Sequence, residues 1–237
     1  DGTRAAVAYF IMGRSANSRN RVFRLKDGAL YTEPFDLSRV EDPSLIIYAA
    51  VRTEQNRLIV TNGDQTDTVC NFLKEGKTFR EALETRAFEP DGPNFTPRIS
   101  GGLTFGKGDF SYEMSILKSI DDVGSDCARY FFSYPSKAGL GHFLHTYVTD
   151  GSPIPTFQGE PERVAHARRD DRDWDLWARA LSGVGAARGA RASGRRHPYF
   201  GSLGKPGFSK QDFSVCPVCG SGKRPLRRTA REQKRLN

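Results

Sequence analysis

Short apolar runs separated by polar turns make up the first 165 residues of this 237-residue chain. Five early runs are typical of β-strands; they lie at residues 7–12, 22–25, 31–35, 45–51 and 58–60. Apolar residues then recur at helical spacing in two segments, 64–74 and 78–88. Four more strands are expected, at residues 98–105, 112–117, 129–134 and 142–148. This order predicts an α+β fold with mostly antiparallel sheets rather than a doubly wound fold.

The segment 44–67 combines a hairpin with the start of a helix. Its two apolar runs flank a polar turn at residues 54–56, which predicts a β-hairpin. Tyr48 and Arg52 bring polar groups into the first run, and the four residues after Asn62-Gly63 are helix N-cap candidates. Since a buried hairpin that ends at a helix N-terminus makes an anion pocket, we expect an anion to bind here.

The composition changes near residue 166. Residues 166–237 carry 17 Lys and Arg against six Asp and Glu, whereas residues 1–165 carry 19 against 22. The chain is therefore divided into a domain at 1–165 and a basic tail at 166–237. The tail is rich in Arg, Gly and Ala and has too few apolar residues for a core, so we expect disorder beyond Ser182. Two interpretations stay open: out-of-frame reading of G+C-rich DNA, which is favoured, or a nucleic-acid-binding arm.

The overall charge bounds the partners and the location. The formal net charge of +8 comes entirely from the tail, so nucleic-acid binding would have to rest on that segment. No window approaches the roughly 18 consecutive apolar residues of a membrane span, and no secretory signal is visible. We expect a cytoplasmic protein. The chain begins with Asp1 instead of Met, which indicates a fragment that has lost its natural start.

Cysteine and histidine spacing gives little support for a metal site. Cys70 and Cys127 lie in apolar surroundings and are interpreted as core residues. Cys216 and Cys219 form a single CxxC pair, a weak zinc motif without a second pair of ligands. The four histidines match no metalloprotease or nucleophile–base pattern. We therefore expect no metal and no Ser-, Cys- or His-based nucleophilic catalysis.

Polar residues gather at three predicted strand ends, in segments 14–21, 48–67 and 89–98. Arg52 and Arg98 each adjoin an apolar run, so they should be partly buried and need an anionic partner. A nearby carboxylate or a ligand phosphate could serve. These clusters favour acid–base chemistry by Glu, Tyr and Arg on an anionic substrate.

Five parts of the chain carry a family resemblance. They read AYFIMGRSANSRNRVF, DPSLIIYAAVRT, LIVTNGDQTDTV, FEPDGPNFTPRISG, and GHFLHTYVTDG with FQGEPERVA. In this order, through residues 6–165, they resemble the archaeal-type IMP cyclohydrolase family and its bacterial relatives. The resemblance implies an N-terminal-nucleophile-hydrolase-like αββα sandwich without a self-processing nucleophile. It also implies closure of 5-formamidoimidazole-4-carboxamide ribonucleotide to IMP with loss of water, and no cofactor. Assembly into a homo-oligomer stays open.

The resemblance also assigns residues to roles. Arg21 would hold the formyl oxygen as negative charge develops, Tyr48 would donate a proton to it, and Glu89 would take the proton from the carboxamide nitrogen. Loop length leaves Asp91 as the alternative to Glu89. Eight residues are expected to hold the base and the phosphate: Arg14, Asn20, Arg52, Asn62, Thr66, Asp67, Thr96 and Arg98.

Two other functions stay open from the sequence. The chain could be a catalytically silent relative that binds purine nucleotides, or a protein that binds nucleic acid through its tail. The family's first strand is expected before Asp1, and no segment after residue 165 resembles the family's last elements. Both features predict a truncated and shifted gene product whose activity is open.

Overall fold

The structure is a computed structural model of the chain. It describes residues 5–165, except 12, 14, 41, 42, 44 and 45, together with the backbone of residues 197–203.

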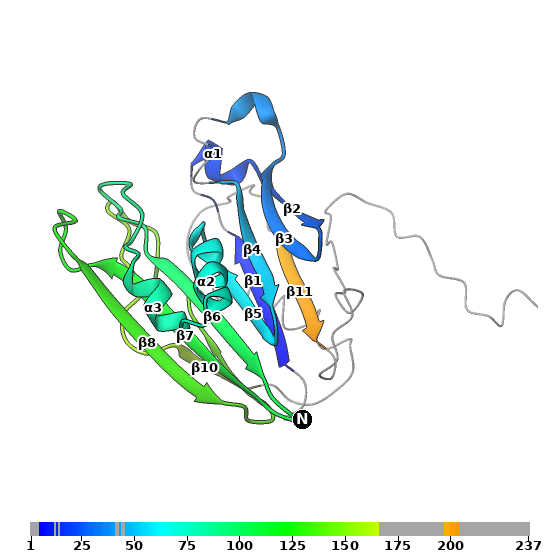
Figure 1. Cartoon of the computed structure of the whole chain (residues 1–237). Coiled ribbons are helices and arrows are strands. Elements are labelled where there is room, and N and C mark those ends of the chain that lie inside the picture. The colour runs from blue at the N-terminus through cyan, green and yellow to red at the C-terminus, as the bar shows by residue number, and fades with distance from the viewer. Residues whose placement is uncertain are drawn as a thin grey trace, which may run out of the picture.

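A seven-stranded antiparallel sheet forms the centre of the domain (Figure 1). Its strands follow each other in sequence order, and each is hydrogen-bonded to the next: β2 (Arg21–Lys26), β3 (Ala29–Pro34), β4 (Tyr48–Glu54), β5 (Arg57–Thr61), β6 (Arg98–Phe105), β7 (Phe110–Ser119) and β8 (Cys127–Pro135). The predicted α+β class with mostly antiparallel sheets is confirmed, and so is the hairpin, which is β4 and β5.

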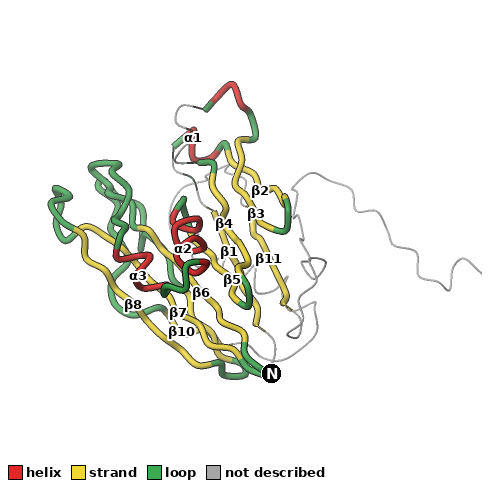
Figure 2. The backbone as a smooth tube through the Cα atoms, in the orientation of Figure 1, coloured by secondary structure: helices red, strands yellow, loops and turns green. Residues whose placement is uncertain are grey.

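Two helices cover one face of this sheet (Figure 2): α2 (Gln65–Lys74) and α3 (Phe79–Glu84). Val69 and Leu83 of these helices are fully buried against Ile59 of β5 and other sheet residues. The predicted capping box opens α3, since the Thr78 hydroxyl accepts from the amide of Glu81 at 3.1 Å and the Glu81 carboxylate accepts from the amide of Thr78 at 2.7 Å.

A glycine lets α3 approach the sheet closely. A Cβ on Gly102 of β6 would lie 3.0 Å from the ring of Phe79, the first residue of α3. Of the Gly101-Gly102 pair, which the sequence places inside a strand, it is therefore Gly102 that makes room for a buried aromatic ring.

Two strand ribbons lie on the opposite face. In the first, β1 (Ala5–Ile11) pairs antiparallel with β11 (His197–Leu203), and Ala5 and Tyr9 pack into the core cluster of β3 to β6. In the second, β9 (Leu140–Phe143) pairs with β10 (Glu162–Ala165), and Leu144 packs against Ile116. The described residues thus supply one helical layer, a sheet and a strand layer. The full αββα sandwich stays a prediction.

Some sequence-based boundaries are wrong. A strand is predicted at 142–148, but β9 spans Leu140–Phe143, and the chain leaves the ribbon after Phe143. The second helix ends at Glu84 instead of residue 88. The polar loop after β1 contains a short helix, α1 (Ala16–Arg19), and the β3–β4 connection contains the 3₁₀ helix η1 (Leu37–Arg39). Strand β11 lies within the segment whose composition predicts disorder; the rest of 166–237 is outside the described residues.

A bulge in β4 decides where Tyr48 points. Leu30 of β3 pairs with Val51, but the next residue, Tyr31, pairs with Ala49, so Ala50 is an extra residue. Strict alternation would put Tyr48 and Val51 on opposite faces, whereas both belong to the core cluster under β1. In the part of the chain that the structure describes, no helix is long and apolar enough to cross a membrane.

Candidate active site

Four strand ends meet at one edge of the domain. Arg21, Tyr48 and Arg98 are the first residues of β2, β4 and β6, and Thr61 is the last residue of β5. Because neighbouring strands are antiparallel, alternate strand starts and the intervening strand end lie at the same edge. Members of all three polar clusters of the sequence are therefore brought to one region by the meander.

A buried pair of tyrosines lies at this edge. The hydroxyl oxygens of Tyr9 and Tyr48 are 3.0 Å apart, and the two residues are only 8% and 5% exposed. Arg21 donates from Nη1 to the Tyr48 hydroxyl at 3.4 Å and from Nε to the carbonyl of Ser18 at 2.8 Å. Burial raises the pKa of Tyr48, and the Arg21 charge and the Tyr9 hydrogen bond act in the opposite direction. Arg21 and Tyr48 are thus in contact, and the guanidinium charge lies beside the phenol that the resemblance assigns as the acid.

Glu89 is an acid–base group poised near neutrality. Burial raises its pKa from 4.5 to about 7, while Arg98 and, less strongly, Arg21 lower it. Its backbone amide donates to the carbonyl of Thr96 at 2.9 Å, which holds the loop that carries it. The same carboxylate also affects the titration of Tyr48, so the three residues assigned to catalysis lie within electrostatic reach of one another.

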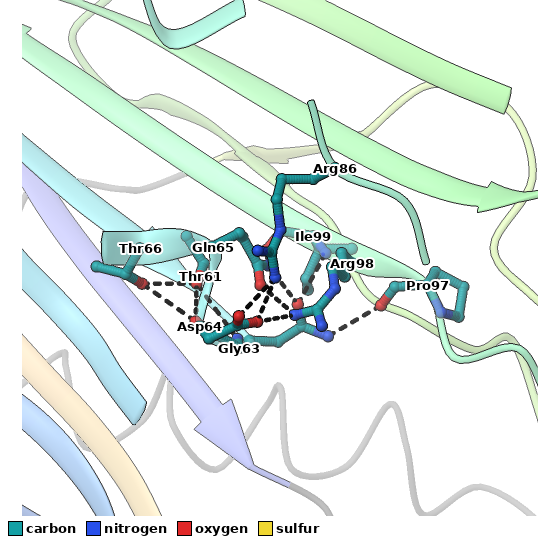
Figure 3. A network of polar contacts seen from close by, with 10 residues as sticks. Thr61, Gly63, Asp64, Gln65, Thr66, Arg86, Pro97, Arg98 and Ile99 are labelled. Atoms are coloured by element: carbon teal, nitrogen blue, oxygen red, sulfur yellow. Dashed lines mark hydrogen bonds and ion pairs between the residues drawn. The ribbon is translucent and has the colours of Figure 1, made fainter. Parts of the chain in front are cut away.

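An ion-pair network lies at the junction of β5, α2 and β6 (Figure 3), and two of its members, Arg98 and Asp64, affect the titration of Glu89. Arg98 Nη1 lies 2.7 Å from the Asp64 carboxylate and 2.7 Å from the side-chain oxygen of Gln65. Arg86 Nη2 contacts both oxygens of the same carboxylate at 2.6 Å. Asp64 is the residue before α2, but its side chain makes no capping bond. The protein's own carboxylate thus lies beside the helix start where the sequence predicts a bound anion.

The side-chain amide of Asn62 links β5 to β6. It donates to the carbonyl of Pro97 at 2.9 Å, and its oxygen accepts from the amide of Ile99 at 2.9 Å and from Gln65 at 3.0 Å. Since these bonds use both ends of the amide, Asn62 shapes the edge of the site from within the protein.

The hydroxyl of Thr66 is equally occupied. It lies 2.6 Å from the hydroxyl of Thr61, and both residues are about 1% exposed. Thr61 also donates to the carbonyl of Gly63 at 2.8 Å. These bonds fasten the first turn of α2 to the end of β5, so the expected substrate contact of Thr66 stays a prediction.

Thr96 belongs to a third group of contacts, in the loop after α3. Its amide donates to the Asp91 carboxylate at 2.6 Å, and its hydroxyl contacts that carboxylate and the hydroxyl of Tyr147, the latter at 2.6 Å. Asp91 is therefore occupied within its own loop, whereas no hydrogen bond involving the carboxylate of Glu89 is found among the described residues. This difference favours Glu89 over Asp91 as the base.

Two expected substrate residues lie away from this group. Arg52 pairs across the hairpin with Ile59, on the helix-covered face, and its guanidinium forms an ion pair with Asp67 in the first turn of α2. Tyr48 lies on the opposite face because of the bulge. The structure therefore separates Arg52 and Asp67 from the tyrosine pair.

Asn20 holds a loop. Its side chain donates to the carbonyl of Asp36 at 2.6 Å and accepts from the amide of Asp36 at 2.8 Å. It thereby fixes the β3–β4 connection to the start of β2, next to Arg21. Arg14 lies outside the described residues.

Comparison with known proteins places this site in a family. The model of the family described as "IMP cyclohydrolase-like protein" matches residues 1–178. The chain belongs to this family. It is 32% identical over 191 residues to an IMP cyclohydrolase of Methanopyrus kandleri, covering 76% of this chain and 93% of that protein. It is 28% identical over 145 residues to an IMP cyclohydrolase of Methanococcus aeolicus, covering 60% of this chain and 66% of that protein.

The family match contains the whole described site, from Tyr9 to Tyr147, and continues past the boundary at 165. Within the described residues, no three His, Cys, Asp or Glu side chains gather as a metal site would require. Cys70 is buried and its pKa is raised to about 11, mainly by burial, which fits a core residue. The CxxC pair, Cys216 and Cys219, lies outside the described residues.

Sequence reasoning missed several members of the site. Tyr9 lies in an apolar run and reads as a core strand residue; its signal was a phenol in an otherwise apolar strand, as for Tyr48. Gln65 is expected only as a helix N-cap candidate, and Arg86 only as part of the predicted helix 78–88. Tyr147 approaches Thr96 from a segment 51 positions away in sequence, and no local pattern marks such a contact.

Proposed function

We propose that this chain is an IMP cyclohydrolase, which closes 5-formamidoimidazole-4-carboxamide ribonucleotide to IMP with loss of water. The names of its two relatives support this reaction. The observation that carries it is a partly buried carboxyl group of pKa about 7, Glu89, within electrostatic reach of a tyrosine that accepts a hydrogen bond from an arginine. Such a pair supplies a base and an acid at the same pH.

In the first step the carboxamide nitrogen attacks the formyl carbon. Glu89 accepts a proton from this nitrogen as the N–C bond forms. Tyr48 donates its proton to the formyl oxygen, and Arg21 stabilises the negative charge that develops on the oxygen and on the phenol. The product is a cyclic carbinolamine with protonated Glu89 and a Tyr48 phenolate.

In the second step water leaves. Protonated Glu89 returns its proton to the departing hydroxyl, and the former formamide nitrogen loses its proton to the Tyr48 phenolate as the C=N bond forms. Atoms and charges balance, and both side chains recover their starting protonation states. Because neither step changes an oxidation state, the reaction needs no redox partner.

The eight residues that are expected to bind the substrate fall into two groups. Thr96 accepts from the amide of Glu89, Arg98 acts on the Glu89 carboxylate, and Asn62 bonds to the strand that Arg98 opens. These three, together with Thr66 and Arg14, are proposed to bind the purine ribonucleotide. Asn20, Arg52 and Asp67 are proposed to act by holding loops and α2 in place. The family resemblance supports a second helical layer, which would complete the N-terminal-nucleophile-hydrolase-like αββα sandwich.

The test is a cyclisation assay on the full chain with three single variants, Arg21→Ala, Tyr48→Phe and Glu89→Gln. Each should lower kcat by about 10²–10⁴-fold, because each removes an acid, a base or a charge from the reacting atoms. The matched controls are Arg24→Ala, Tyr112→Phe and Glu84→Gln, which change the same residue types outside the site and should leave kcat within about twofold.

If the wild-type chain is active and all three site variants keep a kcat close to the wild-type value, the site assignment is overturned. A wild-type chain that is stabilised by IMP in a thermal-shift measurement, yet gives no turnover, would overturn the reaction and select a nucleotide-binding relative. A salt-sensitive gel shift that is abolished by deleting 166–237 would instead support tail-dependent nucleic-acid binding.

A further inference from the structure

The Tyr48 hydroxyl has a neighbour that the catalytic assignment does not use. Tyr9 lies on β1, which pairs with β11 and packs over the seven-stranded sheet. Its ring lies against Phe23, with ring centroids 5.8 Å apart, and its hydroxyl is 3.0 Å from that of Tyr48. Only 8% of Tyr9 is exposed, so its side chain has little contact with bulk water, and its hydroxyl forms a hydrogen bond with the hydroxyl of Tyr48.

Either oxygen of this pair can be the donor, so the direction follows from the role proposed for Tyr48 as the proton donor to the substrate. A phenol carries one proton to donate and accepts through its oxygen lone pairs. Arg21 can only donate, so it occupies one acceptor position. If Tyr48 gave its proton to Tyr9, none would be left for a substrate. Tyr9 as donor fills a second acceptor position and leaves the Tyr48 proton directed away from both neighbours.

We propose that Tyr9 is a positioning residue: its hydroxyl donates to Tyr48, directs the Tyr48 proton toward the substrate, and stabilises the phenolate after proton transfer. This inference rests on the proposed function for its effect on rate. The hydrogen bond itself is independent of turnover. Two donors on one oxygen, Tyr9 and Arg21, form an oxyanion-type environment built into the protein.

The electrostatics around Tyr48 agree with this direction. Burial raises the pKa of Tyr48, whereas Arg21 and the Tyr9 hydrogen bond lower it, and Glu89 raises it. The pKa of Tyr9 is raised well above its ordinary value, first by burial and then by Tyr48, so Tyr9 keeps its proton. Thr32 on β3 is bonded to the backbone of residues 46 and 48, at 2.7 and 3.3 Å from their carbonyl oxygens.

The kinetic test is an electronic series at position 9. Tyr9→Phe removes the donor and keeps the ring, and should lower kcat about 3–10-fold with little change in KM. Replacing Tyr9 by 3-fluorotyrosine, a more acidic donor of similar shape, should keep kcat at or above wild type. Tyr112→Phe, which removes a hydroxyl bonded to His142 instead, is the control. In the Tyr48→Phe background, Tyr9→Phe should have no further effect.

The second readout needs no turnover. Placing 3,5-difluorotyrosine at position 48 brings that phenol's titration to an accessible pH, where ¹⁹F NMR and absorbance follow it. Adding Tyr9→Phe should raise its pKa by about 0.5–1 units, because the phenolate loses a donor. No rise, or a fall, would overturn the proposed direction even if a rate effect is seen.

The two readouts separate the failure of this inference from failure of the proposed function. If the wild-type chain gives no turnover but the position-48 titration shifts, the reaction fails and the hydrogen-bond assignment stands. If the chain turns over but the titration and the electronic series are flat, the role of Tyr9 is overturned and the reaction stands. Should Tyr9→Phe lower stability, the 3-fluorotyrosine variant still tests the electronic effect.

Discussion

Arg98 and Asp64 form an ion pair, 2.7 Å between Nη1 and Oδ1, that joins the first residue of β6 to the residue before α2. Arg98 is nearly buried, with 10% of its side chain exposed, and Asp64 is half exposed. Arg86, from the segment after α3, binds the same carboxylate. One carboxylate therefore connects three segments around Glu89, and the pair affects both the electrostatics of the site and its stability.

Arg98 controls the titration of Glu89. Among the charges acting on Glu89, Arg98 lowers its pKa most, so Arg98→Gln should move the pKa of Glu89 above 7. The acidic limb of the kcat/KM profile should move to higher pH by the same amount. Arg86→Gln is the matched control, because it removes a guanidinium from Asp64 but not one of the main charges acting on Glu89. Equal shifts in both variants would contradict this role.

Glu89 should set the pH dependence of the reaction. A base of pKa about 7 predicts that kcat/KM falls about tenfold per pH unit below pH 7. In Glu89→Gln this limb should disappear along with most of the activity. A wild-type profile that is flat between pH 5 and 7 would exclude Glu89 as the base.

The same carboxyl group should cost stability at high pH. Its folded pKa is raised above 4.5, so the folded state binds the proton more tightly and stability falls as pH rises from about 4.5 to 7. Glu89→Gln should therefore raise Tm at pH 8 and change it little at pH 4, as measured by calorimetry or thermal shift. Glu84→Gln, an exposed change on α3, should show no such difference between the two pH values.

Asp64 should act in the opposite sense. Burial favours its neutral form, but Arg98 and Arg86 bring its pKa below 3.8 overall. Its stabilisation is thus fully present above pH 3.8 and is lost as pH falls through the lower folded pKa. Asp64→Asn should lower Tm at pH 7, and progressively less as the pH falls below 3.8. Asp122→Asn, on an exposed turn, is the control, and a pH-independent loss in Asp64→Asn would argue against an electrostatic origin.

Gly63 leaves room for this ion-pair network because it has no Cβ. A Cβ there would overlap Nη1 of Arg98 and lie 2.6 Å from the side-chain oxygen of Gln65. Gly63→Ala should therefore destabilise the fold by roughly 1–3 kcal/mol and disturb the titration of Glu89. Gly101→Ala is the control, since its Cβ would come no closer than 3.9 Å to the Val60 carbonyl and should change stability by about 1 kcal/mol or less. Chemical denaturation of both variants measures the difference.

Local pattern was sufficient for the hairpin, α2 and the capped start of α3. Alternation and helical spacing are short-range properties, and the Thr78–Glu81 box is complete within four residues. The ends of elements were harder: β9 stops at Phe143 because the chain leaves its ribbon there, which no composition cue marks. For the same reason the pairing of β1 with β11, across more than 180 residues, could not be predicted from sequence.

By itself, the sequence determined the α+β class, the order of strands and helices, the residue types available for acid–base chemistry, and a family resemblance that the comparisons confirm. Only the tertiary structure decided which of those residues meet. The extra residue at Ala50 turns Tyr48 toward Tyr9 and away from Arg52, and the meander places Glu89 within reach of Arg21 and Arg98. The reason is physical: periodicity assigns a residue to a face one strand at a time, whereas contacts and burial depend on the register between strands far apart in the chain.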